Sequence, residues 1–169
     1  DFKTLLKFSL PGLIIALHWI TFFEAIEQSN ISITLAMFST AAFFTSFIEP
    51  LFFRRKIIYY EIIMGLLVIT GVYLITTAEI SYLNGIILGI FSALFSSLFS
   101  VFNGKLVKKY SPITISFYEF LTGVIFITSY LLVTESFSSV YIENIFSLDY
   151  FYLFILGSVC TAYAFIAAV

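Results

Sequence analysis

The run GIILGIFSALFSSLFSVFN, residues 85–103, contains no charged side chain in 19 residues. An α-helix rises about 1.5 Å per residue, so a run of this length covers the roughly 30 Å of hydrocarbon in a bilayer. A strand of a transmembrane β-barrel is about half as long and alternates apolar with polar residues, which this run does not do. The stretch therefore predicts a membrane-spanning α-helix.

Small side chains recur every four residues along this run, in two neighbouring stripes. The first stripe is Gly85, Gly89, Ala93 and Ser97, and the second is Ser92, Ser96, Ser100 and Gly104. Small residues at this spacing allow helix backbones to approach closely inside a membrane. We expect residues 85–103 to form a central helix, held in place by static packing or able to slide between two partners.

Five further apolar runs have about the length that one crossing needs. With residues 85–103 they make six runs, the others being 8–26, 33–53, 57–77, 113–133 and 150–169. Only helices satisfy every backbone polar group within a lipid-exposed segment when no barrel pattern is present. The sequence therefore predicts an all-α fold, a polytopic transmembrane helical bundle.

Composition supports this class and excludes several others. Hydrophobic residues make up 61% and charged residues 11% of the 169, against about a quarter charged in soluble chains. One cysteine and one histidine cannot form a Cys/His zinc cluster or an internal disulfide, and the basic residues make no face for nucleic acid. Motifs of membrane proteases, esterases and ATP-driven pumps are missing. We expect no cofactor and no enzymatic activity.

The basic residues fall before or between alternate runs and nowhere else. They are Lys3, Lys7, Arg54, Arg55, Lys56, Lys105, Lys108 and Lys109. The remaining connections carry only acids, such as Glu27, Glu79 and Asp149. The positive-inside rule then predicts that the basic connections lie in the cytoplasm.

Proline and serine mark three expected helix features. Ser111 and Pro112 are typical of an N-cap followed by proline at the first helical position. Pro11 is expected in the first turns of its helix, where a missing donor costs little. Pro50 is expected either to bend or to terminate its helix.

The histidine is the deepest ionisable residue of the first run. His18 follows Phe8 by ten residues, which is about 15 Å of helix and therefore the bilayer midplane. Transporter cavities lie near this plane and often have aromatic walls, and Trp19, Phe22 and Phe23 could supply them. The alternative is a buried histidine hydrogen-bonded to a neighbouring helix.

Three carboxylates also have both structural and functional interpretations. Glu24 is expected to reach the outer headgroups. Glu49 lies close to Arg54 and Arg55, so an interfacial ion pair is expected there, with a gating or coupling role as the alternative. Glu119 lies about 9 Å inside its helix, where gating or coupling and structural pairing with a lysine remain equally open. Further polar side chains that could line a path are Asn103, Tyr118, Thr161 and Tyr163.

Several segments together resemble a known transporter family. They are ALHWITFFEAI (16–26), SNISITLAMFSTAAFFTSFIEPLFFRRKI (29–57), EIIMGLLVITGVYLI (61–75), GIILGIFSALFSSLFSVFNGKLVKKYSPITISFYEFLTGVIF (85–126) and YLFILGSVCTAYAFIAAV (152–169). The pattern is similar to EamA-type transporters of the drug/metabolite transporter superfamily. Residues 1–77 resemble the C-terminal part of the first repeat, and residues 85–169 the N-terminal part of the second.

The resemblance implies a ten-helix protein made of two inverted five-helix repeats around a substrate cavity. The chain would be a fragment covering the third to eighth helices, with four helices missing. Residues 8–26 and 150–169 would then be equivalent helices that cross the membrane in opposite directions, as the charge pattern independently predicts.

These inferences combine into one functional prediction, an integral secondary transporter in the bacterial cytoplasmic (inner) membrane that moves a small organic metabolite or drug by alternating access. The expected partners are the substrate and the lipid bilayer, without nucleic acid, and a homodimer stays open. The predicted cavity residues are His18, Trp19, Phe22, Thr161 and Tyr163, and the gate or coupling residues are Glu49 and Glu119. A non-transporting membrane scaffold is the alternative, and a membrane-embedded enzyme would need clustered ligands or a nucleophile.

Overall fold

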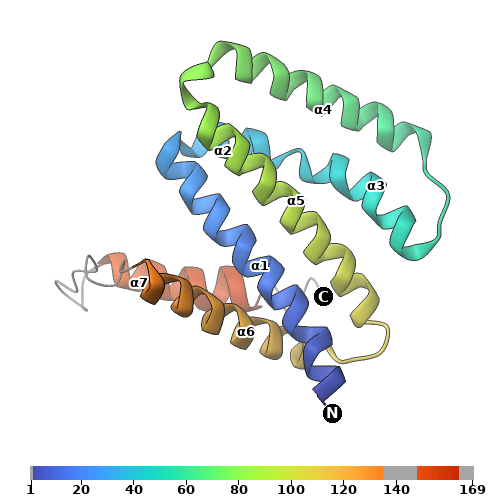
Figure 1. Cartoon of the computed structure of the whole chain (residues 1–169), viewed down its shortest axis with the longest axis vertical. Helices are drawn as coiled ribbons and strands as arrows, with labels where there is room; N and C mark the ends of the chain where they lie inside the picture. Colours follow the sequence, from blue (N-terminus) through green and yellow to red (C-terminus); the bar gives the residue numbers. More distant parts are fainter. Residues whose placement is uncertain (1, 135–147, 164–169) are drawn as a thin grey trace. The chain divides into compact units, whose positions relative to one another are not determined.

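Every regular element of the described chain is a helix. The computed structural model describes residues 2–134 and 148–163, and within these ranges it contains no strand. The elements in chain order (Figure 1) are α1 (Phe2–Gln28), α2 (Ile31–Phe38), α3 (Ala41–Phe53), α4 (Tyr59–Ala78), η1 (Ile80–Tyr82), α5 (Leu83–Leu106), α6 (Pro112–Val133), α7 (Leu148–Ile155) and η3 (Leu156–Tyr163). The predicted all-α helical bundle is confirmed.

Five segments are long and apolar enough to cross a membrane. They are Leu6–Gln28, Ile31–Phe53, Tyr59–Ala78, Ile80–Leu106 and Pro112–Val133. The sixth predicted run is an apolar but shorter helix over Leu148–Val159, and the chain continues as the π-helix η3 to Tyr163. The end of that run, residues 164–169, lies outside the described residues. These spans make the chain a multi-pass membrane protein.

The second span covers Ile31–Phe53, in agreement with the run predicted over residues 33–53, but its α-helical pattern has a two-residue break at Ser39 and Thr40. Helix α2 ends at Phe38 and α3 begins at Ala41. The Ser39 hydroxyl donates to the Ala36 carbonyl at 2.6 Å, and the Thr40 hydroxyl donates to the Met37 carbonyl at 2.7 Å. The Thr40 amide also donates to the Met37 carbonyl at 3.0 Å, so the chain makes a tighter turn here while both residues keep right-handed helical backbone angles. Hydroxyl bonds to the residue three positions earlier compete with the α-helical ladder and favour such a turn.

Of the two prolines inside helices, Pro11 differs from its prediction. Because α1 begins at Phe2, Pro11 lies in the helix interior rather than in its first turns. Pro50 lies inside α3, which continues to Phe53 and ends at Arg54 in the left-handed conformation with φ 53°. Pro50 therefore does not terminate its helix. The Ser111 cap is confirmed, since its side chain accepts a hydrogen bond from the Thr114 amide at 3.3 Å.

The chain divides into two compact units. Unit 1 comprises residues 1–12 and 103–169, and unit 2 comprises Leu13–Phe102. Helices α1 and α5 each contribute a segment to both units.

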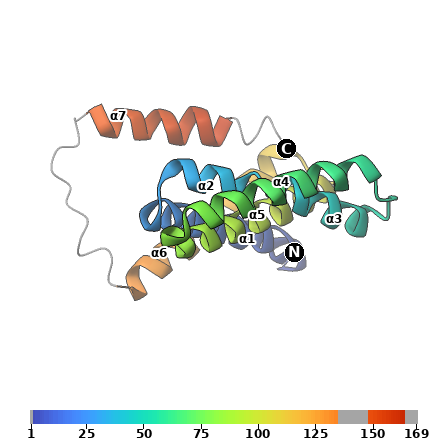
Figure 2. The same ribbon diagram turned by 90° about the horizontal axis from the view of Figure 1, so that it is seen from above.

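In unit 2 the first stripe of small residues on α5 is a packing surface. A methyl group at Gly85 would lie 2.6 Å from Ser29 Cβ, and one at Gly89 would lie 2.8 Å from Met37 Cβ. Ala93 and Ser97 are buried. Figures 1 and 2 show this part of α5 beside α1 and the α2–α3 pair. Within the α5 span 44% of the residues are buried, against 6% within the α4 span, so α5 is the most buried of the five spans as predicted.

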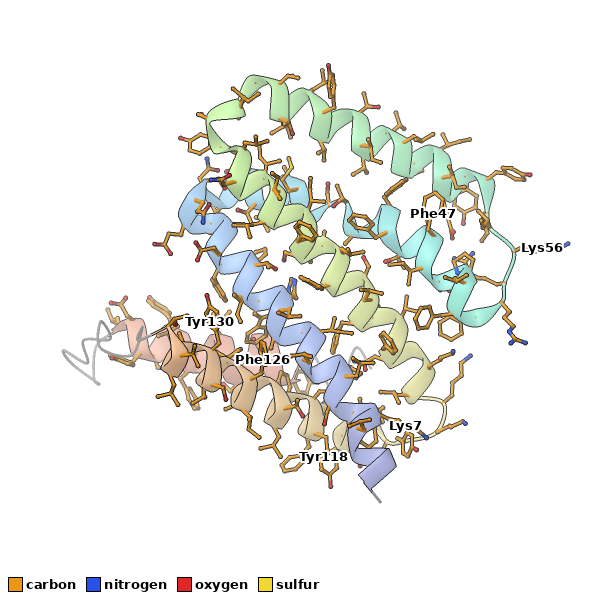
Figure 3. All side chains as sticks on the ribbon, viewed as in Figure 1. Lys7, Phe47, Lys56, Tyr118, Phe126 and Tyr130 are labelled. Carbon is orange, nitrogen blue, oxygen red and sulfur yellow. The ribbon has the colours of Figure 1, made fainter. Side chains whose placement is uncertain are left out.

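Helix α4 packs through one edge and leaves most of its side chains exposed. Gly65 is its one buried residue and lies against the Phe43 ring of α3. Figure 3 shows side chains projecting from both sides of α4 and the Lys56 side chain directed away from the helices on the α3–α4 loop. An apolar helix exposed in this way suits a surrounding of lipid.

In unit 1 the start of α1 packs against α6. Phe8 is buried, meets the Tyr110 ring edge-on at 4.9 Å and stacks on the Tyr118 ring at 5.5 Å. A methyl group at Gly12 would lie 2.7 Å from the Glu119 carbonyl oxygen. Only glycine permits this close approach of the two backbones.

Candidate functional site

His18 is hydrogen-bonded to the neighbouring helix α5 within unit 2. Its Nδ1 lies 3.0 Å from the Ser92 carbonyl oxygen and 2.8 Å from the Ser92 hydroxyl. A carbonyl oxygen can only accept, so a hydrogen bond to it requires the His18 tautomer that carries its hydrogen on Nδ1. The Ser92 hydroxyl donates onward to the His18 carbonyl at 3.3 Å. This is the contact expected if His18 joins two helices.

Two aromatic rings flank the histidine. The Phe22 ring centre lies 5.8 Å from that of His18, and the Phe38 ring centre lies 5.4 Å away. The two phenylalanines also meet each other edge-on at 5.8 Å. Phe22 was named from the sequence, whereas Phe38, the last residue of α2, was not. Trp19 is half-buried at the next position of α1.

The break in the second span lies next to this aromatic group, because Phe38 directly precedes it. Thr40 within the break is buried. On the far side of the break, the Ala41 carbonyl accepts a hydrogen bond from the Ser97 hydroxyl of α5 at 2.8 Å. Unit 2 therefore brings together a histidine, an interrupted helix and two buried serines of α5, namely Ser92 and Ser97.

Unit 1 holds a buried carboxyl group. Glu119 of α6 is fully buried, and its Oε2 accepts a hydrogen bond from the Asn103 amide of α5 at 3.2 Å. Three buried oxygens here have no hydrogen-bond partner among the described residues, namely Asn103 Oδ1, Ser116 Oγ and Glu119 Oε1. The hydrogen-bond partner of the Glu119 carboxyl group is thus an amide, and the two alternatives from the sequence, gating or coupling and structural pairing with a lysine, stay predictions.

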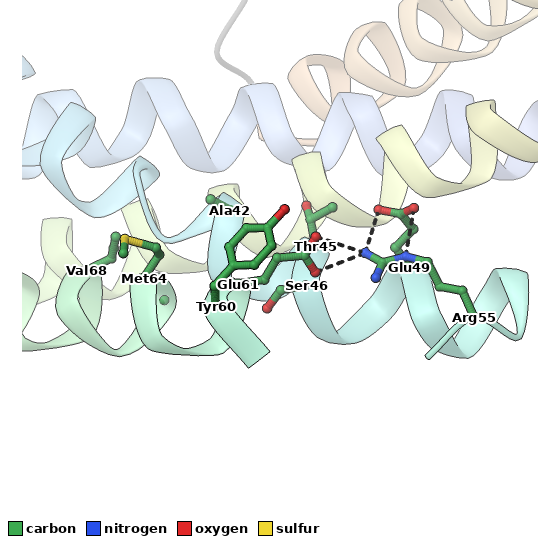
Figure 4. Close-up of a pocket in the computed structure, with 10 residues that line it drawn as sticks. Ala42, Thr45, Ser46, Glu49, Arg55, Tyr60, Glu61, Met64 and Val68 are labelled. Carbon is green, nitrogen blue, oxygen red and sulfur yellow. Dashed lines mark hydrogen bonds and ion pairs between the residues drawn. The ribbon is translucent and has the colours of Figure 1, made fainter. Parts of the chain in front are cut away.

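Three charged side chains form ion pairs at the α3–α4 connection. Arg55 donates from Nε to Glu49 at 3.1 Å and from an Nη to Glu61 at 3.1 Å (Figure 4). Hydrogen bonds to Glu49 and then to Glu61 raise the pKa of the Arg55 guanidinium above its usual value. The predicted ion pair of Glu49 is confirmed with Arg55. Glu61 was missed, although its place in the first turn of α4, six residues from Arg55, was a usable signal.

These charges form one end of a pocket of about 390 Å³ between α3 and α4. Its other walls are mostly small or apolar side chains of both helices (Figure 4). The lining residues are Ala42, Thr45, Ser46, Glu49, Arg55, Tyr60, Glu61, Met64, Gly65 and Val68. None of the five predicted cavity residues is among them.

The remaining predicted cavity residues belong to unit 1. Thr161 and Tyr163 lie in η3, where the Tyr163 side chain is 72% exposed. His18, Trp19 and Phe22 belong to unit 2. The shared cavity proposed for these five residues stays a prediction.

Comparison with known proteins adds no further constraint on the site. No family model, no curated protein and no solved structure matches the chain.

Proposed function

We propose that this chain is part of a secondary transporter that moves a small organic solute across the bacterial cytoplasmic membrane by alternating access. The observation that carries the proposal is the break in the second span at Ser39 and Thr40. His18 meets Phe38 just before this break, and Ser97 is bonded to Ala41 just after it. Discontinuous helices at substrate sites are a recurring feature of secondary transporters. An ionisable group inside a span also needs a functional or structural reason, because its transfer into hydrocarbon is costly.

The resemblance to EamA-type transporters supports the same proposal through its inverted-repeat arrangement. His18 and Phe22 contact each other beside the break, which suits one wall of a central cavity. Trp19, Thr161 and Tyr163 remain proposed as further wall residues, with Glu49 and Glu119 as gate or coupling groups.

The scaffold alternative depends on the stripes of small residues on α5 being free to bind a partner. The first stripe is occupied within the chain itself, because Gly85 lies against Ser29 and Gly89 against Met37. Ser97 is also bonded to Ala41. These contacts favour transport over recruitment of a partner through this surface.

Uptake into proteoliposomes tests the proposal. The complete protein that contains this chain is purified, reconstituted and screened with radiolabelled amino acids, nucleotide-like metabolites and organic cations. We expect His18→Asn to abolish uptake of whichever solute the wild type moves, because asparagine keeps a donor toward Ser92 but removes Nε2 and the ring face. Leu10→Ala, at a position 48% exposed on the same helix, is the matched control and should transport normally.

Two outcomes contradict the proposal. One is that no solute of any class accumulates above empty liposomes. The other is that His18→Asn keeps wild-type KM and turnover, which would leave His18 as a purely structural link between α1 and α5.

A further inference from the structure

Three buried oxygens gather around Glu119 without donors to satisfy them. Asn103, Ser116 and Glu119 are 4%, 2% and 0% exposed, and each has one side-chain oxygen without a hydrogen-bond partner in the described chain. Asn103 is bonded directly to Glu119, and Ser116 precedes Glu119 by three positions on α6, so their side chains share a helix face. Buried polar atoms of this kind require a partner such as an ion or a water.

Ser116 differs from several other hydroxyl residues of the spans. Ser97, Thr45 and Thr76, for example, each donate to the carbonyl four residues earlier at 2.8–2.9 Å. The Ser116 hydroxyl makes no such bond although it is buried. Its oxygen therefore remains available to a group that lies outside the helix.

The chemistry of these oxygens indicates which ion the site would bind. One carboxylate, one amide oxygen and one hydroxyl oxygen are hard ligands, which suit alkali or alkaline-earth cations rather than softer metals. A divalent ion would leave an uncompensated positive charge in a buried site, which is costly. A proton on Glu119 would satisfy one or two of the three oxygens. A monovalent metal ion would cancel the single negative charge and would accept all three oxygens as ligands.

The close packing around the carboxylate leaves little room for a larger ligand. The α1 backbone at Gly12 meets the α6 backbone at Glu119, and Phe8 covers Tyr118 on the adjacent position of α6. An organic solute therefore does not fit beside Glu119. Asn103 lies three residues before the end of α5, about 5 Å of helix, so an ion from the aqueous boundary has a short path.

We propose that Asn103, Ser116 and Glu119 form a binding site for a sodium ion. Binding of the ion by these residues stands independently of the transport function. Its use as the coupling ion rests on the proposed function, because a bound sodium ion would tie α5 to α6 during one half of the cycle.

Equilibrium binding of ²²Na⁺ to the purified protein tests the site, with choline replacing sodium to hold ionic strength constant. We expect saturable binding at one site per chain. Glu119→Gln should abolish it while keeping the size of the side chain. Ser116→Ala should weaken it at least about tenfold, the loss typical when groups that support a metal site are removed. Ser129→Ala, whose hydroxyl on the same helix is bonded to Ile125, is the matched control and should bind normally.

The inference is overturned if the wild type shows no saturable ²²Na⁺ binding, or if Glu119→Gln binds as the wild type does; a water or a proton then satisfies these oxygens. The ²²Na⁺ binding assay and the uptake assay distinguish failure of this site from failure of the transport proposal. Sodium binding without solute uptake would leave this site in place and remove the transport proposal, whereas uptake without sodium binding would do the reverse.

Discussion

The glycines of α5 and α4 provide a paired test of helix packing, because the same substitution should have opposite effects at two positions. At Gly89 an added methyl group would lie 2.8 Å from Met37 Cβ, whereas at Gly71 nothing lies within 4 Å. Carbon atoms normally pack at about 3.5–4.0 Å. Gly89→Ala therefore requires α5 and α2 to separate by about 1 Å, in a region where Met37 is fully buried.

The expected magnitudes follow from this geometry. Overpacking costs roughly 1–3 kcal/mol, and replacing a helical glycine by alanine returns about 0.5–1 kcal/mol. Gly89→Ala should therefore lower the free energy of unfolding by about 1 kcal/mol and by at most about 2.5 kcal/mol, and Gly71→Ala should raise it by about 0.5–1 kcal/mol. The assay is reversible unfolding by sodium dodecyl sulfate in mixed micelles. A Gly89→Ala protein as stable as Gly71→Ala would refute the close approach of α5 to α2.

Two further substitutions probe hydrogen bonds and charges in unit 2. Ser97→Ala should lower the free energy of unfolding in the same micelle assay by roughly 0.6–1.7 kcal/mol, the measured range for hydrogen bonds between membrane helices, because it removes the bond to Ala41; an unchanged midpoint would argue against that bond. Arg55→Gln should lower the melting temperature at low salt, with a difference from wild type that shrinks as salt screens the exposed charges. The raised pKa of Arg55 means that its charge stabilises the fold at every pH below the usual arginine value and is lost only as the pH rises through the raised value. The Arg55→Gln effect should therefore persist unchanged on moving from neutral to mildly alkaline pH, and its disappearance there would contradict the pairing with Glu49 and Glu61.

The spans and the α6 cap were predictable because their causes are local. A run such as residues 85–103 exposes its length and apolarity directly in the sequence, and the Ser111–Pro112 pair fixes a helix start without help from distant residues. The small stripe on α5 also indicated close packing, since glycine and alanine every four residues have few other uses in a span.

The partners of the buried polar groups were not predictable, because they depend on how one helix is rotated against another. Ser92 was noted on the second stripe of α5, but nothing local indicated that it faces His18. The break at Ser39 and Thr40 also escaped prediction, since hydroxyl residues usually bond back to the preceding turn without ending a helix. Here two adjacent residues make the shorter bond to the third preceding carbonyl, and tertiary contacts such as that of Ser97 with Ala41 stabilise the result.

The central claim is that the chain threads a bilayer with its basic connections on one side, and cysteine labelling tests it most directly. In a Cys160→Ala background, Glu79→Cys at the α4–η1 connection and Lys56→Cys at the α3–α4 loop are each treated with an impermeant maleimide in intact cells. We predict that the Glu79→Cys protein is labelled at once and that the Lys56→Cys protein is labelled only after the inner membrane is permeabilised. Labelling of Lys56→Cys from outside, or protection of Glu79→Cys, would contradict the proposed threading.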